Sequence, residues 1–261
     1  MVHGGVLTEK DITELYVSVL SKWQQQKAAV ESDIDRVLHN FRILFAYHSG
    51  KIENDRIDYH DTHEIFENGK ISSYTGDIRT LFEQQNQKDC YDFLKPKIAR
   101  REPLSLELVK QVHFELTKGT YDERRYNVNE ERPGEFKKHD YVVGRYDVGS
   151  PAENVHKEIA EIVSEINAAA AADILTAASY FHGAFENIHP FADGNGRAGR
   201  TLMNYYFMIS GHPPIVVHEE RRGEYYNALD SFHLKEDIAP LKAYFKSECV
   251  QTWAKPFRIL R

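Results

Sequence analysis

The chain has 261 residues, 41% of them hydrophobic, which is long enough to bury one sizeable core or two modest ones. Its formal net charge is −7, and acidic and basic residues are mixed along it, so it lacks the basic stripe that duplex nucleic acid requires. No apolar run reaches the roughly 18 residues of a membrane-spanning helix, and the N-terminus lacks an apolar signal core. Two cysteines are too few for a disulfide framework. We therefore expect a cytoplasmic protein that contacts neither nucleic acid nor membrane.

Apolar residues that recur every three or four positions predict helices through most of the chain. In the first half these are a helix capped by Thr8 and continuing to Trp23, one from Ile34 that ends near Gly50, one over 75–100 that Pro96 kinks or ends, and one over 104–116. In the second half they are a helix from a Ser150–Glu153 capping box, one capped by Asp173 through Phe185, one between Arg197 and Gly211, and one over 238–253. The alanine run 168–172 leaves the end of the Ser150 helix open.

The pattern changes between Gly119 and Gly149. Pro133-Gly134 is a turn signal, and β-favouring residues flank a polar centre after it, which predicts one β-hairpin. The predicted fold class is therefore all-α with one β-hairpin.

Residues 189–200 read HPFADGNGRAGR, a density of ionisable, amide and glycine residues that packing does not require. If a helix begins within this segment, Gly194 and Gly196 let backbone N–H groups converge on an anion at the helix N-terminus. Arg197 and Arg200 project from one face of that helix, and their planar guanidinium groups suit β- and γ-phosphates. The segment predicts a nucleoside triphosphate site.

Two further residues of this segment suit phosphate chemistry. Asp193 offers a hard oxygen ligand beside the phosphates, which predicts one Mg²⁺ held together with substrate oxygens. His189 is the only group in the segment whose ordinary pKa lies near neutrality, which makes it the candidate general base for an attacking hydroxyl. The reaction implied is phosphoryl or nucleotidyl transfer.

The segment resembles the Fic-family signature HPFxDGNGRxxR at every fixed position, and the resemblance covers roughly residues 104–246. It implies the Fic helical bundle with a hairpin flap, ATP as co-substrate, and Phe191 as an anchor in the core. It also implies His189 as base, Asp193 on magnesium, Gly194, Asn195 and Gly196 around the α- and β-phosphates, and Arg197 and Arg200 toward the β- and γ-phosphates. Gly196 favours AMP transfer, because Doc-like kinases of the family have lysine there.

Two other segments gain a role from this resemblance. Tyr225 and Tyr226 stand where similar proteins contact adenine, and a planar ring stacks well on a base; the alternative is that both rings close a helical core. Segment 134–144 resembles the family's flap, whose edge strand pairs with an extended segment of the target protein.

Residues 49–54 read SGKIEN and match the (S/T)xxxE(G/N) motif of Fic proteins that carry an inhibitory helix. Glu53 paired with Arg200 would remove the cationic partner of the γ-phosphate and place a like charge beside it. Ser49 and Glu53 are therefore predicted to be inhibitory; the alternative is that Glu53 is a solvated helix residue. The resemblance divides the chain into an N-terminal helical region (1–103), a Fic catalytic domain (104–248) and a C-terminal tail (249–261).

These residues together predict a protein adenylyltransferase that moves AMP from ATP to a Ser, Thr or Tyr hydroxyl of a target protein, is inhibited in cis by Glu53 and modifies itself. The same site leaves open the transfer of UMP, phosphate or phosphocholine, or de-AMPylation with Glu53 positioning water. A nucleotide-sensing regulator is the non-enzymatic alternative. The target protein and the choice between a monomer and a homo-oligomer stay open.

Overall fold

The structure is a computed structural model of the chain and describes residues 8–26, 30–71, 74–143, 147–169 and 173–259. The helices are α1 (Glu9–Gln24), α2 (Glu31–Glu53), α3 (Tyr59–Asn68), α4 (Ile78–Ala99), α5 (Leu106–Thr117), α6 (Ala152–Ala168), α7 (Ile174–Ile188), α8 (Asn195–Ile209), α9 (Arg222–Lys235) and α10 (Ala239–Trp253). The shorter elements are a π-helical segment (Arg124–Val128), β1 (Val142–Val143), β2 (Asp147–Val148) and a 3₁₀ turn (Glu219–Arg221).

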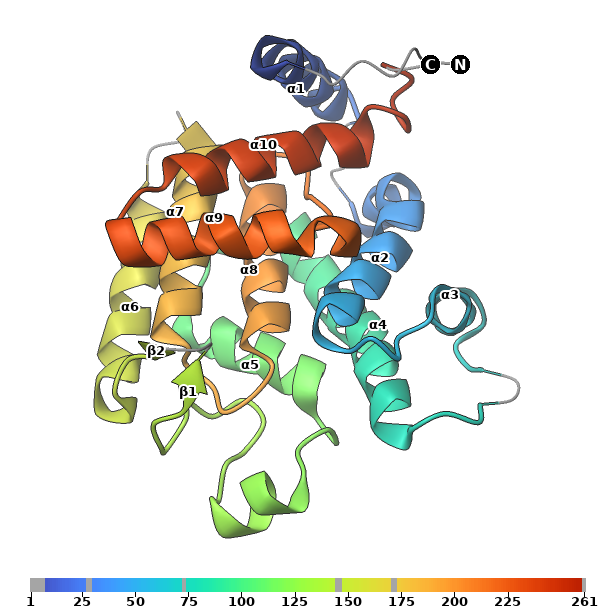
Figure 1. The fold of residues 1–261 in the computed structure, drawn as a ribbon. Helices are drawn as coiled ribbons and strands as arrows, with labels where there is room; N and C mark the ends of the chain where they lie inside the picture. The colour runs from blue at the N-terminus through green and yellow to red at the C-terminus, as the bar shows by residue number, and fades with distance from the viewer. Residues whose placement is uncertain (1–7, 27–29, 72–73, 144–146, 170–172, 260–261) are drawn as a thin grey trace.

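The helices pack around a central pair, α7 and α8. The pair is flanked by α6 beside α7, by α5 against α8, and by α2 and α4 on the far side of α8, while α9 and α10 cross it (Figure 1). Among the described helices, none is long and apolar enough to cross a membrane. The helical part of the predicted fold class is confirmed.

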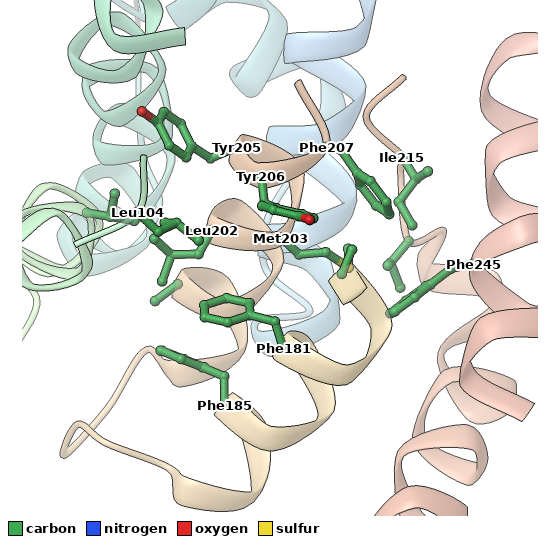
Figure 2. Packing of buried hydrophobic residues seen from close by; sticks show 14 of the residues in the cluster. Leu104, Phe181, Phe185, Leu202, Met203, Tyr205, Tyr206, Phe207, Ile215 and Phe245 are labelled. Carbon is green, nitrogen blue, oxygen red and sulfur yellow. The ribbon is translucent and has the colours of Figure 1, made fainter. Parts of the chain in front are cut away.

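One continuous apolar core joins the N-terminal helices to the rest of the chain. Phe181 and Phe185 of α7 are fully buried beside Leu202 of α8 (Figure 2). The same cluster reaches Val19 in α1 and Trp253 at the end of α10. Because α1 and α2 share this core, the helix that carries Glu53 is held firmly against α8.

Two helix ends differ from the sequence prediction. The second helix does not stop near Gly50 but continues to Glu53, and the N–H of Asn54 donates to the carbonyl of Gly50. A side chain at Gly50 would press against Ile57, so this glycine serves close packing rather than termination. Pro96 lies inside α4, which ends three residues later at Ala99. Glu53 is thus the last residue of a 23-residue helix.

The N-terminal caps are confirmed in two of three places. Thr8 forms a capping box with Asp11, and Asp173 accepts the N–H of Thr176. The expected Ser150 capping box is wrong, because the N–H of Ser150 donates to the carbonyl of Ile188 instead. The carboxylate of Asp140 accepts the N–H of Ala152, at 2.9 Å, and caps α6 from the preceding loop.

The strand pairing is shorter and later than the hairpin expected from sequence. Val142 pairs with Val148 and Val143 with Asp147, in antiparallel order, whereas residues 134–141 lie in turns and irregular backbone. Gly144, the last residue of the predicted flap, falls outside the described residues, as do 170–172 of the alanine run. Residues 134–143 nevertheless lie beside the loop between α7 and α8 through a bond from the N–H of Lys137 to the carbonyl of Pro190.

Candidate active site

The loop over 189–194 joins the C-terminus of α7 to the N-terminus of α8. His189 has a left-handed backbone, with φ of 50°, which is uncommon outside glycine and turns the chain sharply at the end of α7. The side chain of Asn195 accepts the N–H of Phe191 at 2.9 Å and donates to its carbonyl at 2.8 Å. These two bonds close the loop, so any contribution of Asn195 to a phosphate falls to its backbone N–H.

Phe191 anchors the loop in the core, as expected. Its ring is fully buried and stacks on the imidazole of His113, with centroids 3.6 Å apart. The Nδ1 of His113 accepts the N–H of Gly134, so its Nε2 carries the proton and donates to the carbonyl of Asp193 at 2.8 Å. Burial lowers the pKa of His113 to about 3, which keeps the ring neutral for this double role.

The two glycines at the start of α8 are required by close contacts. Gly194 has φ of 79°, and a Cβ there would lie 2.6 Å from the Cγ2 of Thr117. A side chain at Gly196 would collide with the carboxylate of Glu53. The carboxylate of Glu53 therefore lies at the N-terminus of α8, the end of the helix that favours an anion.

Arg200 holds this carboxylate in place. Its Nη2 donates to the Oε1 of Glu53 at 2.8 Å and to the carbonyl of Ser49 at 2.9 Å, and its Nε donates to the hydroxyl of Ser49 at 3.1 Å. Arg200 is only 1% exposed, whereas the side chain of Glu53 is 38% exposed. All three residues named for the inhibitory contact are thus brought together. The space above Gly196 and beside Arg200 is called the anion position below.

A cavity of about 420 Å³ opens beside the anion position. It is lined by residues of α2, α7, α8 and α9 and of the loops before α6 and α8, namely Glu53, Gly149, Glu186, Asn187, His189, Gly196, Arg200, Tyr225, Tyr226, Leu229, Asp230 and His233. Burial, reinforced by the charge of Lys137, lowers the pKa of His189 to about 4. The imidazole is therefore neutral at pH 7 and has a lone pair free to accept a proton.

Two carboxyl groups of the site have pKa values that are shifted in opposite directions. Burial raises the pKa of Glu186 to about 7, although Arg200 works against this. Burial acts in the same direction on Asp193, but the cations Arg197, Arg125 and Arg79 outweigh it and lower its pKa. Asp193 is therefore ionised and suited to a cation, and Glu186 is partly protonated near neutrality.

Asp193 and Arg197 both contact α4. The Nη2 of Arg79 lies 2.9 Å from the Oδ2 of Asp193, and the Nε of Arg79 donates to Glu83 at 3.1 Å. The Oε1 of Glu83 in turn lies 3.7 Å from the Nη1 of Arg197. The amide of Asn54, the residue after Glu53, donates to the other oxygen of Glu83 at 2.8 Å. Two residues of α4 thus form ion pairs around the start of α8. Arg79 pairs with Asp193, just before the helix, and Glu83 pairs with Arg197, in its first turn.

The two predicted base-stacking tyrosines have different surroundings. Tyr225 is 1% exposed, and its hydroxyl lies 2.7 Å from the Nε2 of the buried His182, so its ring is part of the core. Tyr226 is 43% exposed at the rim of the cavity. The structure therefore leaves Tyr226 as the ring with a face available to a base.

The profile of the Fic/DOC family matches residues 103–207, which include this loop and both helices that it joins. Residues 103–207 are a Fic domain. The region that α5 to α8 occupy is thus the Fic domain, and Glu53, Arg79 and Tyr226 reach it from outside the matched residues.

Relatives of this Fic domain are named after an enzymatic activity. Protein adenylyltransferase fic-1 of Caenorhabditis elegans is 28% identical over 213 residues, which are 80% of this chain and 40% of the relative. Protein adenylyltransferase Fic of Drosophila persimilis is 39% identical over 74 residues, which are 28% of this chain and 14% of the relative. The chain spans about 40% of the length of the first of these relatives.

Two solved structures share the fold over nearly the whole chain. A Fic-domain-containing signalling protein from Bacteroides thetaiotaomicron superposes with a TM-score of 0.77 and 21% identity, over 95% of each chain. A fragment of Fic-1 from Caenorhabditis elegans has a TM-score of 0.74 and 23% identity, over 95% of this chain and 73% of that one. The helices before the Fic domain therefore belong to the shared fold.

Sequence reasoning missed several groups around the Fic loop. Arg79 and Glu83 lie more than a hundred positions before the loop, in a helix whose local sequence shows only a mixed polar face. Glu186 precedes the motif by three positions and looks like a solvated helix residue until its burial is known. Lys137 is 3% exposed, although it belongs to the polar centre of the hairpin predicted from sequence.

Proposed function

We propose that this chain transfers AMP from ATP to a hydroxyl group of a protein side chain, and that Glu53 inhibits the transfer in cis. The relatives' names support the reaction class, and the cavity beside His189 supports its location. The observation that carries the proposal is the carboxylate of Glu53 at the anion position, bound by Arg200 over Gly196. An anion already bound there indicates what the position is built to hold.

In the proposed reaction, the oxygen of the target hydroxyl attacks the α-phosphorus of ATP. A new O–P bond forms, the bond from the α-phosphorus to the bridging oxygen of the β-phosphate breaks, and diphosphate leaves. His189 accepts the proton of the hydroxyl, which its neutral ring permits. Arg197 and Arg200 bind the leaving phosphates, and the N-terminus of α8 stabilises the charge that develops there.

Asp193 fits a role in holding magnesium. It is an ionised carboxylate at the start of the loop, and Mg²⁺ usually takes one or two carboxylates together with phosphate oxygens and water. When bound, the ion would neutralise charge on the phosphates. Arg79 pairs with the Oδ2 of Asp193, so the guanidinium of Arg79 has to move aside for this oxygen to bind a metal.

Glu53 inhibits by occupying the anion position. While it accepts from Arg200, a γ-phosphate lacks its cationic partner and meets a carboxylate instead, which is unfavourable on both counts. ATP is then excluded or bound with its α-phosphorus away from His189. When Glu53 leaves the anion position, Arg200 is available to bind the phosphates of the nucleotide.

The proposed contacts with the base of ATP and with the target protein follow from which groups are exposed. The base of ATP stacks on Tyr226, the exposed ring at the rim of the cavity. The target protein docks on the flap: β1 and β2 form a sheet of only two strands among the described residues, so each keeps an outer edge for β-augmentation.

The reaction is tested by incubating Glu53→Gly with ATP labelled on the α- or the γ-phosphate. Incorporation of the α-label alone into protein supports AMP transfer, and loss of that signal in Glu53→Gly with His189→Ala assigns it to this site. Incorporation of the γ-label alone would make the protein a kinase. A UTP or CDP-choline label that replaces the ATP label would reassign the transferred group.

A further inference from the structure

The ammonium group of Lys137 is buried and has no partner within the part of the chain that the structure describes. Lys137 is 3% exposed, and among the described residues its Nζ forms neither a hydrogen bond nor an ion pair. A buried, unpaired charge is costly, and a lysine is almost never fully buried without a reason. The next residue shows the contrast, since Lys138 is 45% exposed and donates to the carbonyl of Glu130.

Backbone bonds hold Lys137 beside His189. The N–H of Lys137 donates to the carbonyl of Pro190 at 2.9 Å, and the N–H of Ser150 donates to the carbonyl of Ile188 at 3.1 Å. Of the two residues that flank His189, Pro190 is therefore bonded to the flap and Ile188 to Ser150, just before α6. The backbone of Lys137 is thus fixed beside the loop that carries His189.

Gly149 lets the lysine and the histidine approach each other. A Cβ built on Gly149 would lie 3.2 Å from the Nζ of Lys137 and 2.7 Å from the Cβ of His189. The ammonium of Lys137 and the Cβ of His189 thus both lie within contact distance of the space that a side chain at Gly149 would fill. The Nδ1 of His189 is also buried and without a hydrogen-bond partner among the described residues.

Charged and titratable groups from several elements surround His189. The groups that act on it are the cation Lys137, the anions Glu53 and Asp193, and the backbone of Glu186, which like the anions favours the protonated ring. The other titratable groups that line the same cavity are Glu186, Arg200, Tyr225, Tyr226, Asp230 and His233. Burial lowers the pKa of Lys137, and the carboxylates of Asp140, Glu158 and Glu131 oppose this by favouring the ammonium form. Lys137 is the cation in the first set, and it counters the anions that favour a protonated imidazole.

We infer that Lys137 is a positioning residue that keeps the imidazole of His189 unprotonated while the phosphates of a nucleotide lie beside it. This inference rests on the proposed function. A triphosphate brings several negative charges next to the imidazole, and nearby negative charge favours its protonated form. A protonated His189 has no lone pair with which to accept the proton of the target hydroxyl. A fixed ammonium on the flap side offsets the phosphates.

The test is an NMR titration of His189 in the Glu53→Gly protein, with and without a non-hydrolysable ATP analogue. The signal is assigned by its loss in His189→Asn. In Lys137→Met the titration midpoint is expected to rise by about 1 pH unit with the analogue bound, as removal of one close charge does. Lys137→Arg keeps the parental midpoint, and so does Lys138→Met, the matched control.

The same variants are then assayed for transfer across pH. The acid limb of the profile in Lys137→Met moves upward with the NMR midpoint, while Lys137→Arg retains the original limb. An unchanged midpoint in folded Lys137→Met overturns the inference and leaves the lysine a structural role. If Lys137→Met does not fold, Lys137→Gln takes its place. Because the titration needs no turnover, it tests the role of Lys137 even in a protein that does not transfer AMP.

Discussion

Arg200 and Glu53 meet at 2.8 Å across the interface between α8 and α2, with the carboxylate directly over Gly196. The arginine is buried and is bound at three points, two of them on Ser49. Helix α2 thus contacts Arg200 through a hydroxyl, a carbonyl and a carboxylate. Only the carboxylate competes with a phosphate by charge, and the other two fix the direction in which the guanidinium points.

Ser49→Ala is expected to relieve inhibition in part. The variant removes the hydroxyl that accepts from the Nε of Arg200 and leaves the other two bonds in place. A hydrogen bond to a charged group contributes about 1.5 kcal/mol, so transfer should rise about tenfold. The measurement is the rate of α-label incorporation. Ser18→Ala, on exposed α1, is the control, and an equal rate in both variants would contradict a role for the hydroxyl.

Arg79→Ala is expected to strengthen the binding of a divalent ion. Arg79 holds the oxygen of Asp193 that a metal would take, so its removal should raise the affinity for Mn²⁺ about tenfold, in proportion to one close charge removed. Isothermal titration of the nucleotide-free protein gives the affinity. Arg56→Ala, which breaks an exposed pair with Asp77, should change nothing. Weaker binding in Arg79→Ala would mean that the arginine only supports the loop.

Substitutions of Tyr225 and Tyr226 are expected to have different effects. The first should lower stability, and the second should weaken nucleotide binding. Tyr225→Phe removes the hydroxyl partner of the buried His182 and should lower the free energy of unfolding by about 1–3 kcal/mol. Tyr226→Ala removes an exposed ring and should weaken ATP binding with little loss of stability. Urea denaturation and equilibrium binding of an ATP analogue check both. The reverse pattern, with Tyr226 needed for stability, would contradict the assignment.

Glu186 is expected to make stability fall as pH rises. Its pKa is raised by burial from 4.5 to about 7, so between these values the unfolded chain has lost a proton that the folded chain keeps. The contribution is fully present below pH 4.5 and is lost through pH 7, a change of roughly 3 kcal/mol. His189, whose pKa is lowered, acts in the opposite direction below pH 6.5.

The comparison with Glu186→Gln isolates the carboxyl group. Urea denaturation at pH 5 and pH 7.5 gives the two free energies of unfolding for each protein. The difference between parent and variant should change with pH, because only the parent has the carboxyl. A constant difference would show that Glu186 keeps an ordinary pKa.

The sequence predicts the loop well because its determinants are local. The fixed residues of 189–200 shape and close the loop among themselves, as the bonds of Asn195 to Phe191 show. Most helices follow from apolar periodicity for the same reason. The sequence also predicts the pairing of Glu53 with Arg200, because a short local motif marks Ser49 and Glu53; the bonds from Arg200 to Ser49 are a further finding of the structure.

The rest depends on contacts between distant elements. Arg79 and Glu83 reach the loop only because α4 packs beside α8, which no local pattern reveals. Ser150 fits a capping box by sequence, but Asp140 takes the cap and frees Ser150 to bind the loop. Lys137 and Lys138 are alike in sequence and differ only in burial. Burial, which the fold sets, distinguishes the two lysines.

The most direct test of the account is the intact mass of the protein after incubation with magnesium and ATP, in the parent, Glu53→Gly, and Glu53→Gly with His189→Ala. Glu64→Gly, which removes a glutamate from α3, is the matched control. The account predicts that Glu53→Gly alone gains the mass of AMP, on itself or on an added protein. Equal gain in the parent and Glu53→Gly, or a gain that survives His189→Ala, would contradict it.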